Sequence, residues 1–205
     1  MKKELIKRIN PLRKILALFI IASALYYHFL GKNIALITFS ILMALFLFFD
    51  FLHYSSKGRN KFACLFFKLY PKKSFEKKHI FTDGTIFFIS TILMILFFPK
   101  EIVVLSLIIY GFCDQAERIF GILFSSEKLF WNKSKNWIGT LFGLFIAILA
   151  GTLFTRLLNL NFSMHSLIIA SALAALAGTL KNKGMIFDDN LLMPWLTALS
   201  FLIFQ

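Results

Sequence analysis

The strongest constraint on this chain is a succession of seven apolar runs, each close in length to the thickness of a bilayer's hydrocarbon core. A soluble domain of 205 residues that is 59% hydrophobic could not cover its apolar surface with its own polar residues. We therefore predict an all-α fold, a polytopic integral membrane helix bundle that forms a single domain over residues 1–205. The expected transmembrane helices cover residues 15–31, 33–52, 82–99, 101–124, 137–157, 162–180 and 190–204.

The basic residues predict how this bundle is oriented. Of the 23 Lys and Arg residues, only Lys32, Lys100 and Arg156 fall in the odd-numbered connections, and the rest fall in the N-terminal segment and the even-numbered loops. By the positive-inside rule, the N-terminus and the even-numbered loops are cytoplasmic. We expect a multi-pass protein of the cell inner (cytoplasmic) membrane, whose first apolar run is retained as a helix and not removed as a signal peptide.

The composition also indicates partners. The cytoplasmic loop of about residues 53–79 contains "FACLFFKLYP", whose aromatic and basic residues suit an anionic lipid surface, although an ordinary solvated basic loop explains it equally well. The run "SALAALAG" (171–178) is a small-residue face compatible with a homodimer. No nucleic-acid partner is expected. The two cysteines, Cys64 and Cys113, predict neither a disulfide framework nor a zinc site.

Charged residues interrupt the fourth apolar run at "GFCDQAERIFG" (111–121). Glu117 and Arg118 follow Asp114 by three and four residues, so the three side chains lie on the same helix face and can interact. Intramembrane acids mark functional sites, which favours a polar cavity here. The alternative is an ion pair between Asp114 and Arg118 that locks helix packing.

A second polar stretch, "KSKNWIGTLFG" (133–143), enters the fifth run. Lys135 and Asn136 stand where the helix starts, and Gly139 and Thr140 follow one turn later. A helix N-terminus offers N–H groups to phosphate, and a neighbouring Lys adds a positive charge. The alternative is that Gly139 and Gly143 form a GxxxG packing face.

A third stretch, "FDDNLLMP" (187–194), opens the last run. The adjacent carboxylates Asp188 and Asp189 are hard oxygen ligands that suit Mg²⁺ shared with substrate phosphates. Helix capping by Asn190 or by an Asp explains the same residues equally well.

A fourth stretch, "FEKKHIFTDGT" (75–85), enters the third run. For any one of its residues, a basic anchor followed by an N-cap is the simpler explanation. That explanation fits less well when four polar entrances are all expected on one membrane face. Six residues of this stretch crowd the predicted membrane boundary: Glu76, Lys77, Lys78, Thr82, Asp83 and Gly84.

Taken in order, these stretches resemble the CTP-dependent lipid kinase family, which includes dolichol kinase, phytol kinase and CTP-dependent diacylglycerol kinase. The family is distantly similar to phosphatidate cytidylyltransferases. "DQAERIFG" matches the family's Asp followed seven residues later by Gly, at Asp114 and Gly121. "KNWIGT" resembles its Lys-Ser/Thr-x-Glu-Gly-Ser/Thr, "DDNLLMP" its Asp-Asp-Asn-x-x-x-Pro, and "EKKHIFTDGT" its acidic-basic lead and Thr-x-Gly entrance. The resemblance covers about residues 60–200.

The chain departs from the family pattern at several positions. Cys113 replaces a Gly before the membrane Asp, and Ile138 replaces a Glu before the motif Gly. In "NPLRKILA", Asn10 and Ala17 replace a Glu and a His. A lost carboxylate suggests a changed substrate or lost catalysis. The long terminal signature of the cytidylyltransferases is missing from the sequence, which favours the kinase branch.

The resemblance implies transfer of a phosphoryl group from CTP to the hydroxyl of a membrane lipid of the polyprenol, phytol or diacylglycerol type, with Mg²⁺ as cofactor. The implied catalytic residues are Asp114 and Lys135. The implied nucleotide-phosphate ligands are Lys77, Lys78, Lys135, Asn136, Gly139 and Thr140. The implied metal ligands are Asp188, Asp189 and Asp114. The implied supporting residues are Glu76, Thr82, Gly84, Glu117, Arg118, Gly121 and Asn190. A cytidylyltransferase that makes CDP-lipid and a non-catalytic lipid-binding or scaffolding relative are the alternatives.

Overall fold

The computed structural model of the protein describes residues 11–55, 81–124, 126–180 and 188–204. This part of the chain is helical and contains no strand, only an isolated antiparallel bridge between Lys128 and Asn136. The predicted all-α class is confirmed. The helices are α2 (Pro11–Ser55), α5 (Asp83–Phe97), α6 (Lys100–Leu123), α7 (Trp137–Leu157), α8 (Met164–Thr179) and α9 (Asp189–Ile203).

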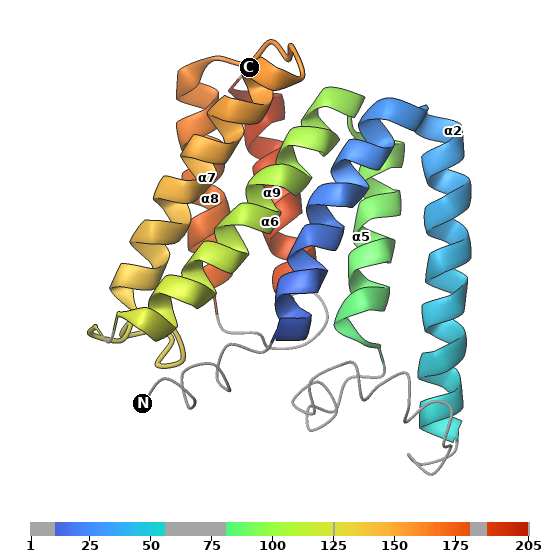
Figure 1. Ribbon diagram of the computed structural model, residues 1–205, viewed down its shortest axis with the longest axis horizontal. Helices are drawn as coiled ribbons and strands as arrows, with labels where there is room; N and C mark the ends of the chain where they lie inside the picture. The colour runs from blue at the N-terminus through green and yellow to red at the C-terminus, as the bar shows by residue number, and fades with distance from the viewer. Residues whose placement is uncertain (1–10, 56–80, 125, 181–187, 205) are drawn as a thin grey trace.

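Helix α2 is a hairpin of two helical arms that meet at Gly31 (Figure 1). Gly31 has φ 81° and ψ 178°, a conformation that side-chain-bearing residues rarely adopt. The Tyr26 hydroxyl and Thr38 Oγ1, one from each arm, lie 2.7 Å apart and form a hydrogen bond across the hairpin. The two arms correspond to the first two predicted spans, which the sequence separates at the same place.

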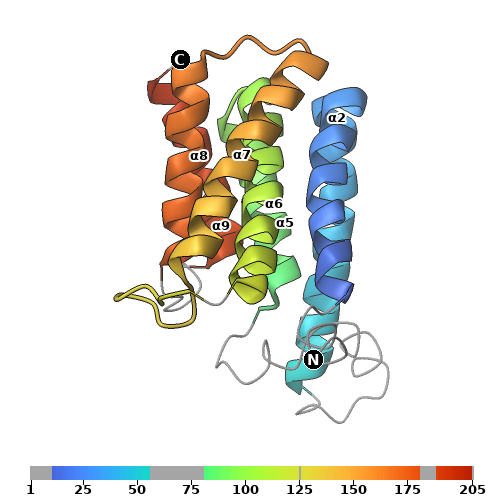
Figure 2. The ribbon, with the colours of Figure 1, turned by 60° about the vertical axis from the view of Figure 1, so that its left-hand side comes forward.

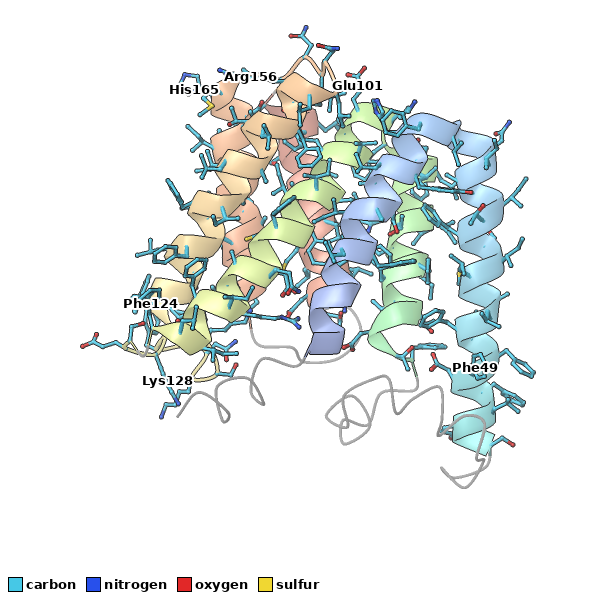
Figure 3. All side chains as sticks on the ribbon, viewed as in Figure 1. Phe49, Glu101, Phe124, Lys128, Arg156 and His165 are labelled. Carbon is cyan, nitrogen blue, oxygen red and sulfur yellow. The ribbon has the colours of Figure 1, made fainter. Side chains whose placement is uncertain are left out.

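Successive helical segments run in alternating directions, so their polar ends gather at one end of the bundle (Figures 1 and 2). The C-terminal ends of α2, α6 and α8 and the N-terminal ends of α5, α7 and α9 lie there, and we call it the site end. Figure 3 shows Phe49, Phe124 and Lys128 at the site end and Glu101, Arg156 and His165 at the opposite end. The four polar stretches picked out in the sequence therefore all enter the bundle from the same side, as far as the structure describes them.

Helix α6 lies at the centre of the bundle and α7 packs on it most extensively, while α2, α8 and α9 also contact it. Every residue from 102 to 111 is buried. Asp114 and Glu117, one and two turns further along, are buried as well, whereas Lys100 and Glu101 at the start of α6 are exposed. The two acids within the apolar part of this helix therefore face protein and not the outer surface of the bundle.

The outer faces of the helices are apolar. On α7, an apolar side chain at every fourth position forms one exposed stripe, made of Leu141, Phe145, Leu149, Leu153 and Leu157. Among the described residues, two helical stretches are long and apolar enough to cross a membrane, Leu18–Leu52 and Trp137–Leu157.

The other helices meet this criterion only in part. Helices α5, α8 and α9 are apolar but have 15, 16 and 15 residues. They are therefore about 22–24 Å long, shorter than a hydrocarbon core of about 30 Å. Helix α6 has 24 residues but carries charges along its length. Each of the last five predicted spans corresponds to a helix, but the helices for 82–99 and 162–180 are shorter than predicted.

Candidate functional site

The Asp114 carboxylate is held by residues of its own helix. Arg118 Nε donates a hydrogen bond to Asp114 Oδ1 over 2.9 Å, and Gln115 Nε2 lies 3.4 Å from Asp114 Oδ2. The Asp114 side chain is 5% exposed and that of Arg118 is 33% exposed. The structure thus contains the ion pair that was the alternative to a functional Asp114.

Glu117 has a different partner from the one that the sequence suggests. Its Oε2 accepts a hydrogen bond from Lys135 Nζ over 2.8 Å, and its side chain is fully buried while that of Lys135 is 19% exposed. Glu117 Oε1 has no hydrogen-bond partner among the described residues. Of the three residues expected to be able to interact, Asp114 and Arg118 form an ion pair, whereas the Glu117 side chain lies against Gly143 of α7 and Gly178 of α8 and pairs with Lys135.

Three glycines make the space that Glu117 occupies. A Cβ at Gly143 would overlap Glu117 Cγ, and a Cβ at Gly178 would lie 3.0 Å from each carboxylate oxygen. A Cβ at Gly139 would lie 2.7 Å from the backbone oxygen of Glu117. We call Gly139, Gly143 and Gly178 the glycine recess. Gly139 and Gly143 lie in the α6–α7 contact, as the packing interpretation of this pair expects.

The first turn of α7 is capped by residues of this chain. Asn136 is the N-cap, and its Nδ2 donates to the carbonyl of Gly121 over 2.7 Å, which ties α7 to the end of α6. The predicted use of the Gly139 N–H for phosphate is not supported by this geometry, because the group is already bonded. The acceptors are Glu127 O for Trp137 N–H, Ser126 Oγ for Ile138, Asn136 Oδ1 for Gly139, and Asn136 O for the Thr140 N–H and hydroxyl.

The N-terminus of α9 is also capped, and it is joined to α6. Asp188 Oδ1 accepts from the backbone N–H and the side-chain amide of Asn190 over 2.9 and 2.6 Å. The Tyr110 hydroxyl donates to Asn190 Oδ1 over 2.5 Å. Sequence analysis missed Tyr110, although its position four residues before Asp114 was a usable signal.

Asp189 brings a further charge to the same place. It lies within electrostatic reach of Lys135, Asp114, Asp188 and Arg118. The structure therefore gathers the predicted residues of α6, α9 and the segment before α7 at the site end.

The N-terminus of α5 is bonded to α2 through a residue that sequence analysis also missed. Asp50 Oδ2 accepts from the Thr82 N–H over 3.1 Å, from the Thr82 hydroxyl over 3.3 Å and from the Thr85 hydroxyl over 2.6 Å. The N-cap that the simpler explanation predicts for this stretch is Thr82, and Gly84 is buried in the first turn of α5. An acid inside the apolar run "LFLFFDFL" was the signal. Glu76, Lys77 and Lys78 lie outside the described residues.

The charges around Lys135 keep its amine protonated. Burial alone would lower the pKa of this amine, but the carboxylates of Glu117, Asp114 and Asp189 act in the opposite direction and leave the pKa raised. Lys135 is therefore a fixed positive charge at neutral pH.

The acidic residues do not form a ready-made metal cage. Within residues 11–55, 81–124, 126–180 and 188–204, no three His, Cys, Asp or Glu side chains converge closely enough to hold a metal ion. Asp114 and Asp188 already accept hydrogen bonds from protein donors. Mg²⁺ commonly binds through one or two carboxylates together with substrate phosphates and water, so Asp188 and Asp189 suit it only as part of such a shared site.

Comparison with known proteins identifies no relative. No protein-family model matches the chain, and no curated protein and no solved structure matches it.

Proposed function

We propose that the protein is a multi-pass membrane protein whose seven helical segments all cross the inner membrane, with the site end toward the cytoplasm. The exposed apolar stripe of α7 and the similar outer face of α2 support this arrangement, since such surfaces suit lipid. The short helices α5, α8 and α9 would span with local thinning of the bilayer. The predominance of basic residues in the segments assigned to the cytoplasm sets the orientation.

We propose that this site transfers a phosphoryl group from CTP to the hydroxyl of a membrane lipid. The observation that carries this proposal is the gathering of two ion pairs, Asp114–Arg118 and Glu117–Lys135, with Asp189 at one end of the bundle. Phosphoryl transfer depends mainly on positioning and charge neutralisation, and fixed cations next to carboxylates serve both. The choice of CTP rests on the family resemblance.

In the proposed reaction, the lipid oxygen forms a bond to the γ-phosphorus while the bond from that phosphorus to the bridging oxygen breaks. CDP leaves, and Asp114 accepts the hydroxyl proton. The Lys135 ammonium binds phosphate oxygens, and Lys77 and Lys78 attract the anionic nucleotide. Mg²⁺, held by Asp188 and Asp189, would supply further neutralisation of the phosphate charge.

The test is transfer of label from γ-labelled CTP to a panel of polyprenol, phytol and diacylglycerol by the purified full chain with Mg²⁺ present. Labelled lipid is the expected product, with unlabelled ATP competing less well than CTP. Lys135→Met should abolish transfer, whereas Lys128→Met, an exposed lysine of the same segment, should not. Label that reaches no lipid would contradict the kinase proposal.

Two other functions give different results. A cytidylyltransferase would transfer α-label from CTP to a lipid phosphate and would release pyrophosphate. A non-catalytic relative that binds lipid or scaffolds a complex would transfer neither label. The observation that favours the second is that both buried acids of α6, Asp114 and Glu117, are already ion-paired. In addition, Cys113 and Ile138 depart from the family pattern. Metal-dependent binding of CTP to the purified protein would argue against that second function.

A further inference from the structure

Glu117 is an unusual residue for the centre of a helical bundle. Its side chain is fully buried, and one carboxylate oxygen has no hydrogen-bond partner among the described residues. A buried carboxylate with one unpaired oxygen is unfavourable, and an apolar side chain would pack the same helices without that cost. Packing alone therefore does not account for Glu117.

The glycine recess holds the Glu117 side chain in one place. Gly143 of α7 leaves room for Cγ, and Gly178 of α8 lies against both carboxylate oxygens. Because a methyl group at either position would meet the side chain, there is little space for the carboxylate to swing away from Lys135. Two helices thus fix the position of a group that belongs to a third.

Lys135 is the less buried member of the pair. Its side chain is 19% exposed, and Glu117 takes one of the three N–H donors of the ammonium. No other hydrogen-bond acceptor of this ammonium lies in the described part of the chain. The ammonium can therefore donate to a ligand without leaving Glu117.

We infer that Glu117 is a positioning residue that holds the Lys135 ammonium at the site end, where the ammonium binds a phosphate group. The phosphate belongs either to a nucleotide or to a lipid head group. The inference rests on the proposed function for the identity of the nucleotide. The Glu117–Lys135 ion pair and its effect on the Lys135 amine can be tested without phosphoryl transfer taking place.

The reactivity of the Lys135 amine provides the test. The full chain, in detergent, is treated with limiting acetic anhydride at a series of pH values, and acetylation of each lysine is measured by mass spectrometry. Only unprotonated amines react with the anhydride. The carboxylates that favour the protonated form of Lys135 are Glu117 and Asp114 of α6 and Asp189 of α9. In Glu117→Gln, the rate at Lys135 should rise by about tenfold or more below its pKa, since an adjacent opposite charge shifts a pKa by about 1–3 units.

The controls separate this effect from a loss of structure. The exposed Lys128 and Lys133 serve as internal references, and Glu127→Gln removes an exposed carboxylate from the same segment without affecting Lys135. If Glu117→Gln does not fold, wild-type protein alone still tests the inference, because Lys135 should react more slowly than Lys133. Equal reactivity of the two lysines in wild type, or an unchanged Lys135 rate in folded Glu117→Gln, would overturn the inference.

Ligand protection identifies the phosphate. CTP and a short-chain phosphatidic acid are added separately before acetylation, and the effective ligand should protect Lys135 in wild type and protect it much less in Glu117→Gln. Protection by neither compound would overturn the phosphate-binding role. Protection without transfer of label to any lipid would leave the inference standing and would refute the kinase proposal.

Discussion

Replacement of Gly143 by Ala tests whether the glycine recess determines the position of Glu117. The added methyl group would overlap Glu117 Cγ and would lie 3.3 Å from the carbonyl oxygen of Cys113. Cγ is close to the α6 backbone, so it cannot move away as easily as the end of a long side chain. Gly178 closes the opposite side, so the carboxylate must leave the recess and its partner Lys135.

The expected loss of stability follows from three contributions. Overpacking costs about 1–3 kcal/mol. Separation of a buried ion pair costs about 3–5 kcal/mol. The higher helix propensity of Ala returns about 1 kcal/mol. The free energy of unfolding should therefore fall by about 3–7 kcal/mol.

Gly151→Ala is the matched control, because it lies on the same helix and is also buried. A methyl group there would meet the ends of the Leu167 and Ile109 side chains at 3.2 and 3.3 Å, and these can shift by small rotations. This variant should therefore differ from wild type by less than about 1 kcal/mol.

Unfolding of the purified proteins in detergent, followed by the loss of helical circular dichroism, measures the difference. The cost of Gly143→Ala should largely disappear in a Glu117→Ala background, since the methyl group then has space. Equal stability of Gly143→Ala and Gly151→Ala, or the same cost of Gly143→Ala in both backgrounds, would refute this explanation of the recess.

Three further variants test the contacts around the site. Asp114→Asn should lower the free energy of unfolding by about 1–3 kcal/mol, which is less than the cost of breaking a fully buried pair because Arg118 is partly exposed. The double change with Arg118→Gln should recover most of this loss. In folded Asp114→Asn protein, label transfer should fall by roughly 10²-fold or more. Tyr110→Phe removes the hydroxyl that bonds Asn190 and should lower the stability by about 1–2 kcal/mol, so an unchanged melting temperature would contradict that bond. Asp50→Asn should cost about 2 kcal/mol and accelerate hydrogen exchange in the first turn of α5 while leaving α7 unaffected.

The positions of the helices could be predicted from the sequence because apolar runs, and the helix-breaking residues between them, are local features. Gly31 divides two apolar runs, and the structure turns there with a backbone conformation that suits glycine. The ends of α5 and α8 were harder to predict, because Phe98 and Leu180 are apolar but adopt extended backbone. Hydropathy measures whether a residue suits an apolar environment, and it does not record where a helical hydrogen-bond ladder stops.

The partners of the charged residues could be predicted only where they are local. Asp114 and Arg118 are four residues apart on one helix, so their pairing could be predicted as an alternative. Glu117 and Lys135 are brought together by the packing of α6 against α7, which no spacing rule describes. The hydrogen bonds from Thr82 and Thr85 to Asp50 could not be predicted for the same reason, because they connect residues that are more than 30 positions apart in the sequence.

The glycines of α7 serve both the packing of the helices and the placement of a charged side chain. Gly139 and Gly143 allow α6 and α7 to approach closely, which is the ordinary role of a small-residue face. The space left by the missing side chain at Gly143 is filled by a carboxylate of the neighbouring helix and not by apolar atoms. Close packing thereby creates the position from which Glu117 reaches Lys135. Because this ion pair requires α6, α7 and α8 to be assembled, whereas Asp114–Arg118 requires α6 alone, substitutions in the recess should disturb the Lys135 amine and the stability of the bundle together.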